Sequence, residues 1–74
     1  MPSSVIRRFA YDPSRRALDI EFVSGRRYRY AAVPAPIVAA FRKAVSKGRF
    51  FNSRIRDRFA FVELEPAPGD GDGA

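Results

Sequence analysis

The sequence predicts an α+β fold: a three-stranded antiparallel meander packed against one helix, followed by a short second helix, with room for a fourth strand. Apolar and polar residues alternate in the first thirty positions, as in strands, and an apolar stripe of helical spacing follows residue 36. The 74 residues suffice for one small core. We therefore expect a single domain over residues 1–65 and a disordered tail over residues 66–74, which lacks an apolar anchor.

The first predicted strand covers residues 5–11, VIRRFAY. Phe9 and Tyr11 share one face, whereas Ile6 falls out of phase, and this predicts an irregularity near the start of the strand. The next five residues, DPSRR, predict a turn, because proline fixes the backbone angle of its first central position and Asp12 can accept bonds from local amides.

The second predicted strand, residues 17–23, shows the clearest alternation in the chain. Its apolar positions are Leu18, Ile20 and Phe22, and its acidic positions are Asp19 and Glu21. A three-residue loop ending in Gly25 then predicts a type I turn with a glycine bulge, which pairs Ile20 with Tyr28 and Leu18 with Tyr30. A two-residue loop would place Ile20 opposite Arg29 and mix the apolar set with the charged set.

This register turns Tyr28 and Tyr30 toward the core, with their hydroxyls at its edge or bonded to the following helix. The alternative is that the two rings form a base-stacking platform, as in sheet-based RNA-binding proteins. On the opposite face the register predicts two cross-strand ion pairs. These pairs are Glu21 with Arg27 and Asp19 with Arg29.

The predicted helix follows VPAP, where Pro34 or Pro36 suits the first helical turn. Its apolar stripe consists of Ile37, Val38, Phe41, Ala44 and Val45. We expect Lys43 and Lys47 to complement its carbonyl end and Gly48 to terminate it. The stripe should cover the apolar face of the meander and complete a two-layer core.

The stretch after Gly48 predicts a short helix from about residue 49 to residue 57, because Phe51, Ile55 and Phe59 recur every four positions. Alternation from Phe59 onward favours a final strand. This stretch is also the densest positive region of the chain. It contains Arg49, Arg54, Arg56 and Arg58, with Asp57 as the only acid among them.

Composition excludes several kinds of site. The chain has no cysteine and no histidine, so it lacks disulfides, thiolates and the usual zinc ligands, and we expect no catalytic residues, metal or cofactor. None of its carboxylates is expected to serve as a catalytic acid near neutral pH, so we do not expect an enzyme. It shows no signal-like or membrane-spanning apolar run, which favours a cytoplasmic protein without membrane contact.

The net charge of +6 favours an anionic partner. Residues 1–65 are more basic still, with 14 bases and 6 acids, because two acids lie in the tail. The contrary interpretation is that the charge only keeps a small protein in solution.

Three stretches, SSVIRRFAYD, ALDIEFVSGRRYRY and VPAPIVAAFRKAVSKGRFFNSRI, resemble the KTSC domain over roughly residues 3–60. This small family is named for its occurrence at the C-terminus of some lysyl-tRNA synthetases and also includes free-standing bacterial proteins. The resemblance rests on the order and spacing of Gly25, Tyr28, Tyr30, Val33 and Pro34, and then of Ser46, Lys47, Gly48, Phe50, Phe51 and Asn52. Ser24 departs from the asparagine common before the turn glycine. The synthetase context suggests RNA binding.

We therefore predict a small basic non-catalytic module that binds nucleic acid, RNA rather than DNA, through an arginine-rich surface. The candidate contacts are Lys47, Arg49, Phe50, Asn52, Arg54, Arg56 and Arg58, with Arg27 and Arg29 as a second patch. Phe50 is a candidate for stacking on an unpaired base, and Asn52 for a ligand bond or a local structural bond. The alternative is a protein-interaction or assembly module that binds an acidic partner or self-associates, as an oligomer, through a sheet edge.

Overall fold

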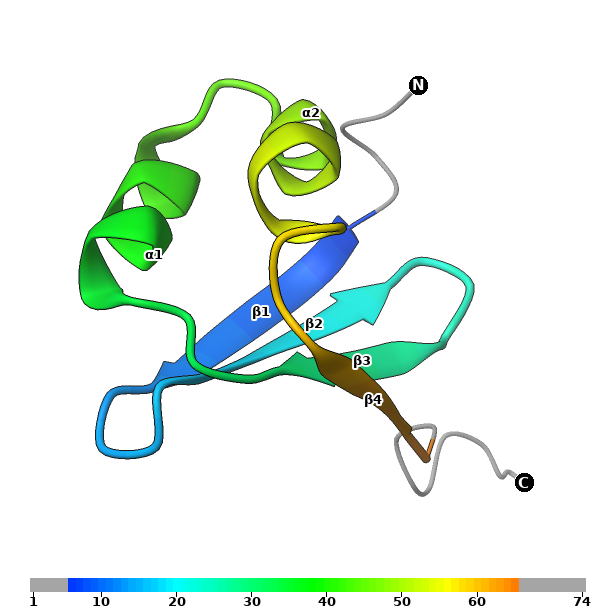
Figure 1. Cartoon of the computed structure of the whole chain (residues 1–74). Helices are drawn as coiled ribbons and strands as arrows, with labels where there is room; N and C mark the ends of the chain where they lie inside the picture. Colours follow the sequence, from blue (N-terminus) through cyan, green and yellow to red (C-terminus); the bar gives the residue numbers. More distant parts are fainter. Residues whose placement is uncertain (1–5, 66–74) are drawn as a thin grey trace.

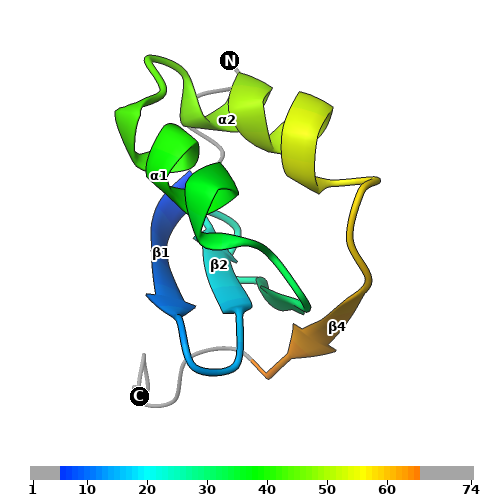
Figure 2. The same cartoon turned by 60° about the vertical axis from the view of Figure 1, so that its left-hand side comes forward.

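The computed structural model describes residues 6–65 as a four-stranded antiparallel sheet with two helical segments over one face (Figures 1 and 2). The strands are β1 (Ile6–Asp12), β2 (Ala17–Phe22), β3 (Arg27–Tyr30) and β4 (Phe61–Leu64), in the order β1-β2-β3-β4. This architecture confirms the predicted α+β fold and includes the fourth strand. The disorder predicted over residues 66–74 lies outside the described residues.

The irregularity predicted in the first strand is present. The register of β1 against β2 shifts between Ile6, which faces Phe22, and Arg8, which faces Glu21. The shift returns Ile6 to the side of the sheet that packs against the core. The turn after β1 is held as predicted, because the Ser14 amide and hydroxyl both donate to Asp12 Oδ1, at 3.1 and 2.8 Å.

The hairpin between β2 and β3 has the predicted three-residue loop. Gly25 adopts φ +98°, in the left-handed region that suits glycine. Its amide donates to the Phe22 carbonyl and the Phe22 amide donates to the Arg26 carbonyl, both at 2.9 Å. The resulting register sets Leu18 opposite Tyr30, and it confirms the predicted pairing.

One of the two predicted cross-strand ion pairs forms and the other does not. Arg29 binds Asp19 through Nε and Nη2, at 2.8 and 3.0 Å. Glu21 and Arg27 face each other in the ladder but form no ion pair, so this prediction was wrong. The β1 bulge brings two other guanidinium groups to Glu21, and Arg27 donates instead to the Glu65 carbonyl at 3.0 Å.

The first helix, α1 (Ala35–Lys43), carries proline in its first turn as predicted, but it is shorter than the apolar stripe suggested. Ala44 is already extended, at φ −64° and ψ 136°. The predictions that the helix continues to Gly48 and that Val45 belongs to its buried stripe were therefore wrong, and Val45 is fully exposed.

The second helical segment begins at residue 47, two residues before the predicted start. It consists of α2 (Lys47–Phe50), which continues directly into the π-helical turn η2 (Phe51–Ile55). Ser46 caps it by accepting a hydrogen bond from the Arg49 amide at 3.2 Å. Because this cap starts a new helix, Gly48 lies buried inside α2 and does not terminate α1.

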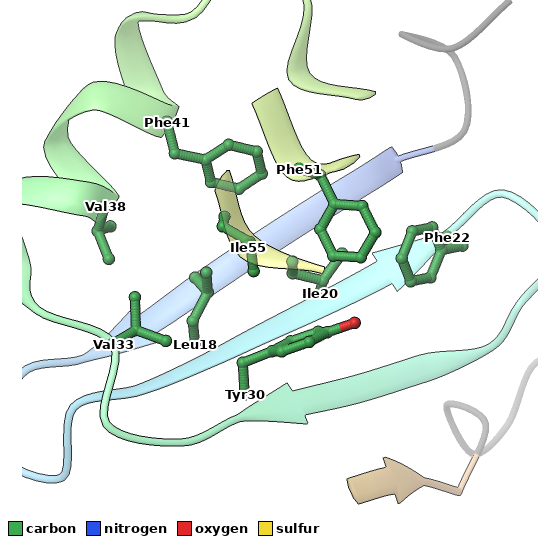
Figure 3. Close-up of a cluster of buried hydrophobic side chains, with 9 residues drawn as sticks. All are labelled: Leu18, Ile20, Phe22, Tyr30, Val33, Val38, Phe41, Phe51 and Ile55. Carbon is green, nitrogen blue, oxygen red and sulfur yellow. The ribbon is translucent and has the colours of Figure 1, made fainter. Parts of the chain in front are cut away.

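The core lies between the sheet and the helical layer (Figure 3). It consists of Leu18, Ile20, Phe22, Tyr30, Val33, Val38, Phe41, Phe51 and Ile55. Tyr30 is buried and Tyr28 half-buried, so both tyrosines face inward as predicted. A third tyrosine, Tyr11, ties the sheet to the start of the helical layer, since its hydroxyl donates to the Val33 carbonyl at 2.6 Å.

Among residues 6–65, the helices are too short and too polar for any of them to cross a bilayer.

Candidate nucleic-acid interface

The α2–η2 segment positions most of the predicted site. Its buried side carries Phe51 and Ile55, which belong to the core. Within η2 the Arg56 amide donates to the Phe51 carbonyl at 2.8 Å, the five-residue step of a π-helix. With Phe51 and Ile55 held against the sheet, the intervening and following polar side chains face solvent.

Four arginines gather along this segment and just after it, and we call them the helical arginine cluster. They are Arg49, Arg54, Arg56 and Arg58, and all four are exposed. Within the part of the chain that the structure describes, none of them forms an ion pair with a carboxylate. The cluster is therefore a concentration of positive charge that residues 6–65 leave unneutralised.

Two cluster members are held by local contacts. The Arg54 guanidinium carbon lies 5.6 Å from the centre of the Phe50 ring. Arg56 donates to the side-chain oxygen of Asn52 at 3.4 Å. These contacts restrain the side chains without cancelling their charge, so the guanidinium groups stay available to an anion.

The other predicted contacts on this segment already have structural partners. Lys47 donates to the Arg42 and Ala44 carbonyls at 3.1 and 3.0 Å, and so complements the carbonyl end of α1 as expected. Phe50 is half-buried and packs against Phe41, with ring centres 5.6 Å apart. Asn52 is exposed, with its oxygen turned toward Arg56.

The second predicted patch lies on the far side of the sheet. Arg27 and Arg29 alternate with the inward tyrosines, so they project from the face opposite the helices. The hydrogen bonds from Arg29 to Asp19 raise the pKa of Arg29 above its ordinary value, and the same carboxylate neutralises its charge. The structure therefore brings residues 47–58 together and separates them from this patch.

A cleft that the sequence did not predict opens between the second helical segment and the sheet. Its volume is about 640 Å³. We call it the aromatic cleft, after four rings on its sheet side: Phe22, Tyr28, Tyr30 and Phe61. The helical side contributes Gly48, Phe51, Asn52, Arg56 and Asp57, and the sheet side also contributes Ile6 of β1 and Ser24 and Arg26 of the β2–β3 loop.

The rings of the aromatic cleft support one another. Phe61 packs against Tyr28 and Tyr30, with ring centres 5.5 and 5.3 Å apart, and Tyr30 packs edge-on against Phe51 at 5.6 Å. Even so, 53% of Phe61 is exposed. The cleft therefore has a fixed aromatic wall with one open ring.

The polar groups of the cleft include phenols and guanidinium groups. Figure 3 shows the Tyr30 hydroxyl pointing along the sheet toward the Phe22 end. Burial raises the pKa of Tyr30 above its ordinary value, so the phenol is neutral at physiological pH. The neighbouring Tyr28 hydroxyl raises the pKa of Arg26, which stays charged.

Part of this cleft was readable from the sequence. The register of the hairpin placed Tyr28 and Tyr30 on the inner face, and alternation placed Phe61 in a strand. The sequence did not predict that this strand lies beside β3, and this position completes the aromatic wall. Within residues 6–65 no group of three potential metal-binding side chains occurs.

Comparisons with known proteins agree with this architecture. A family model described as the KTSC domain matches residues 2–59. An uncharacterised protein of Stutzerimonas stutzeri is 48% identical over 52 residues, which make up 70% of this chain and 73% of that protein. A lysine-tRNA ligase of Nostoc punctiforme is 41% identical over 61 residues, which make up 82% of this chain but only 11% of the ligase. The crystal structure of a KTSC domain protein from Yersinia pestis is similar, with a TM-score of 0.82 and 38% identity over 88% of this chain and 92% of that one.

Proposed function

The chain belongs to the KTSC domain family, and from that premise we propose that it is a non-catalytic cytoplasmic module that binds RNA through the helical arginine cluster. The observation that carries the proposal is that four exposed arginines gather on one short segment without a carboxylate partner among residues 6–65. When guanidinium groups in such an arrangement contact phosphates, they displace the counterions condensed on the nucleic acid, and the release of these ions drives binding.

The charge distribution supports the helical face over the outer face of the sheet. On the outer face, Asp19 neutralises Arg29, and Glu21 pairs with two arginines of β1. An incoming phosphate would have to displace those carboxylates. On the helical face it would meet guanidinium groups whose local partners are an aromatic ring and an amide.

The relatives lend a second, weaker support. Lysine-tRNA ligases that match this chain carry the word tRNA in their names, although the matched segment is only 11% of their length. A basic module attached to such a protein would add affinity for the RNA backbone. A free-standing copy would retain that property for other RNA strands.

Charge reversal in the cluster tests the proposal. The double variant Arg54→Glu, Arg58→Glu should lower affinity for a fluorescein-labelled 12-nucleotide single-stranded RNA roughly tenfold or more at low salt, and about equally for different base sequences. The slope of log K against log salt should become shallower by about 0.7 for each phosphate that the variant no longer binds. Fluorescence anisotropy at two salt concentrations measures both quantities.

The matched control is Arg15→Glu, Arg16→Glu, which changes the net charge by the same amount. Both residues are exposed in the turn between β1 and β2, at the end of the sheet away from the second helical segment (Figure 1). This control should retain most of the affinity. Equal losses in the two double variants would show that the net charge, and not the cluster, attracts RNA, and that result would contradict the proposal.

The second candidate is self-association through β4. This strand is an edge of the sheet, and its Phe61 and Val62 are 53% and 59% exposed. Sedimentation of the protein without RNA distinguishes the two candidates. An increase from the monomer mass to the dimer mass as the protein concentration rises would favour assembly. A constant monomer mass would leave RNA binding as the better explanation.

A further inference from the structure

We infer that the aromatic cleft binds one unstacked nucleotide, with its base on the ring of Phe61 and its phosphate between Arg26 and Arg56. This inference rests on the proposed function and deepens it, because it assigns a base-binding site beside a cluster that contacts only phosphates. The chemistry recognised is an aromatic base joined to a phosphate.

The size and wall of the cleft fit a flat aromatic ligand. Sites for small molecules typically enclose about 300–1,000 Å³, and this cleft has a volume of about 640 Å³. Phe61 is braced by two tyrosine rings, yet half of its surface remains open. A ring fixed in this way offers a stacking face that accepts any base.

The charges on the two walls of the cleft suit a phosphodiester. Arg26 reaches it from the sheet side and Arg56 from the helical side, and neither forms an ion pair among residues 6–65. Among residues 6–65, Asp57 is the single carboxylate that lines the cleft. Two guanidinium groups and one carboxylate leave one net positive charge, which complements the single negative charge of a phosphodiester.

The hydroxyl groups of the cleft suit the polar edge of a base. Tyr30 is only 3% exposed, and its hydroxyl has no hydrogen-bond partner among residues 6–65. Tyr30 lines the cleft, and its hydroxyl can both donate and accept a hydrogen bond there. The Asn52 amide and the Ser24 hydroxyl also line the cleft and can donate or accept.

The test combines a change in the protein with a change in the ligand. Phe61→Leu removes the aromatic face but keeps an apolar side chain, and Val62→Ala changes the adjacent exposed residue of β4 as a matched control. The ligands are a 12-nucleotide single-stranded RNA and a chain of equal length built from abasic spacers, which keeps the phosphates without bases.

Phe61→Leu should weaken binding of the RNA roughly fivefold to 150-fold, the range expected for loss of one base stack, whereas Val62→Ala should leave it unchanged. The abasic chain should bind the original protein more weakly by a similar factor, and Phe61→Leu should not weaken that binding further. Backbone amide shifts in NMR spectra of the unmodified protein with RNA should include Arg26, Gly48 and Asn52.

The outcomes separate this inference from the proposed function. If the RNA and the abasic chain bind equally well and Phe61→Leu has no effect, while reversal of Arg54 and Arg58 still weakens binding, the cleft inference fails and the proposed function stands. If the 12-nucleotide RNA does not bind but AMP or UMP does, and Phe61→Leu abolishes that binding, the cleft is a site for free nucleotides and the proposed function fails.

Discussion

Tyr30 combines a buried ring with a phenol at the margin of the core, and this position has a consequence for stability at high pH. The folded state holds the Tyr30 proton to a pH above 10.0, the ordinary pKa of a tyrosine, because burial disfavours the phenolate. In the unfolded chain the phenol ionises near that ordinary value. The contribution of Tyr30 to stability is therefore fully present below pH 10 and is lost as the pH rises through the folded-state pKa.

Urea unfolding at about pH 9 and about pH 11 tests this prediction. The original protein should lose more stability between the two pH values than the Tyr30→Phe variant, which has no phenol proton at position 30. The difference between the two proteins isolates the contribution of Tyr30 from the effect of pH on the rest of the chain. An identical loss in both would show that Tyr30 does not contribute to the alkaline instability.

The residue scale also shows what the sequence determines well. The inward positions of Tyr28 and Tyr30 followed from the alternation in β2 and from a single glycine that fixed the length of the turn. The partner of Glu21 could not be predicted in the same way. Its ion pairs depend on how far the β1 bulge shifts two neighbouring arginines, and no local pattern encodes that shift.

At the scale of the element, the start of the second helical segment depends on one side chain. Ser46 accepts a hydrogen bond from the Arg49 amide, which would otherwise lack a partner in the first turn. Ser46→Ala should lower the free energy of unfolding by about 1 kcal/mol, the usual cost of losing such a cap. Chemical denaturation of the two proteins measures the difference.

Ser53→Ala is the matched control within the same segment. The Ser53 hydroxyl donates to the Arg49 carbonyl at 3.0 Å, a bond back to the preceding turn that adds little to helix stability. This variant should be nearly neutral. If Ser53→Ala proves as destabilising as Ser46→Ala, the cap is not what defines the start of the helix.

The same element explains why the helix boundary was predicted wrongly. Apolar spacing continues through Ala44 and Val45, so periodicity alone extends α1 toward Gly48. The chain instead becomes extended at Ala44, and the cap on Ser46 begins a separate helix. Apolar periodicity carries no information about a cap, so it could not show that one helix ends at Lys43 and the next begins after Ser46.

At the scale of the whole molecule, stability depends on the buried core, to which residues 6–65 contribute nine side chains. A core of this size rarely supplies more than about 3–5 kcal/mol, and Leu→Ala in a buried site costs about 2–5 kcal/mol. Leu18 is 0% exposed, so Leu18→Ala should leave the protein largely unfolded at room temperature. Near-ultraviolet circular dichroism and thermal denaturation report this change.

Val45→Ala provides the comparison, because Val45 is fully exposed although sequence spacing assigned it to the core. It should change the free energy of unfolding by less than about 0.5 kcal/mol. A large decrease for Val45→Ala would place this residue in the core after all.

The sequence predicted the candidate site only in part. It identified the charged segment at residues 47–58 because the density of arginine is a local property. It could not identify the aromatic cleft, since residues far apart in the chain form its walls. Arg26 and Phe61 meet Arg56 there only because β4 returns to pair with β3 after both helical segments.

That return of the chain also means that an edge strand of the sheet, β4, forms part of one wall of the cleft. β4 has four residues, and within residues 6–65 it pairs with β3 alone and contributes none of the nine core side chains. Such a strand can fray while β2, paired on both sides, stays intact. Fraying of β4 would therefore open the cleft at the margin of the sheet while the strands that carry the core stay paired.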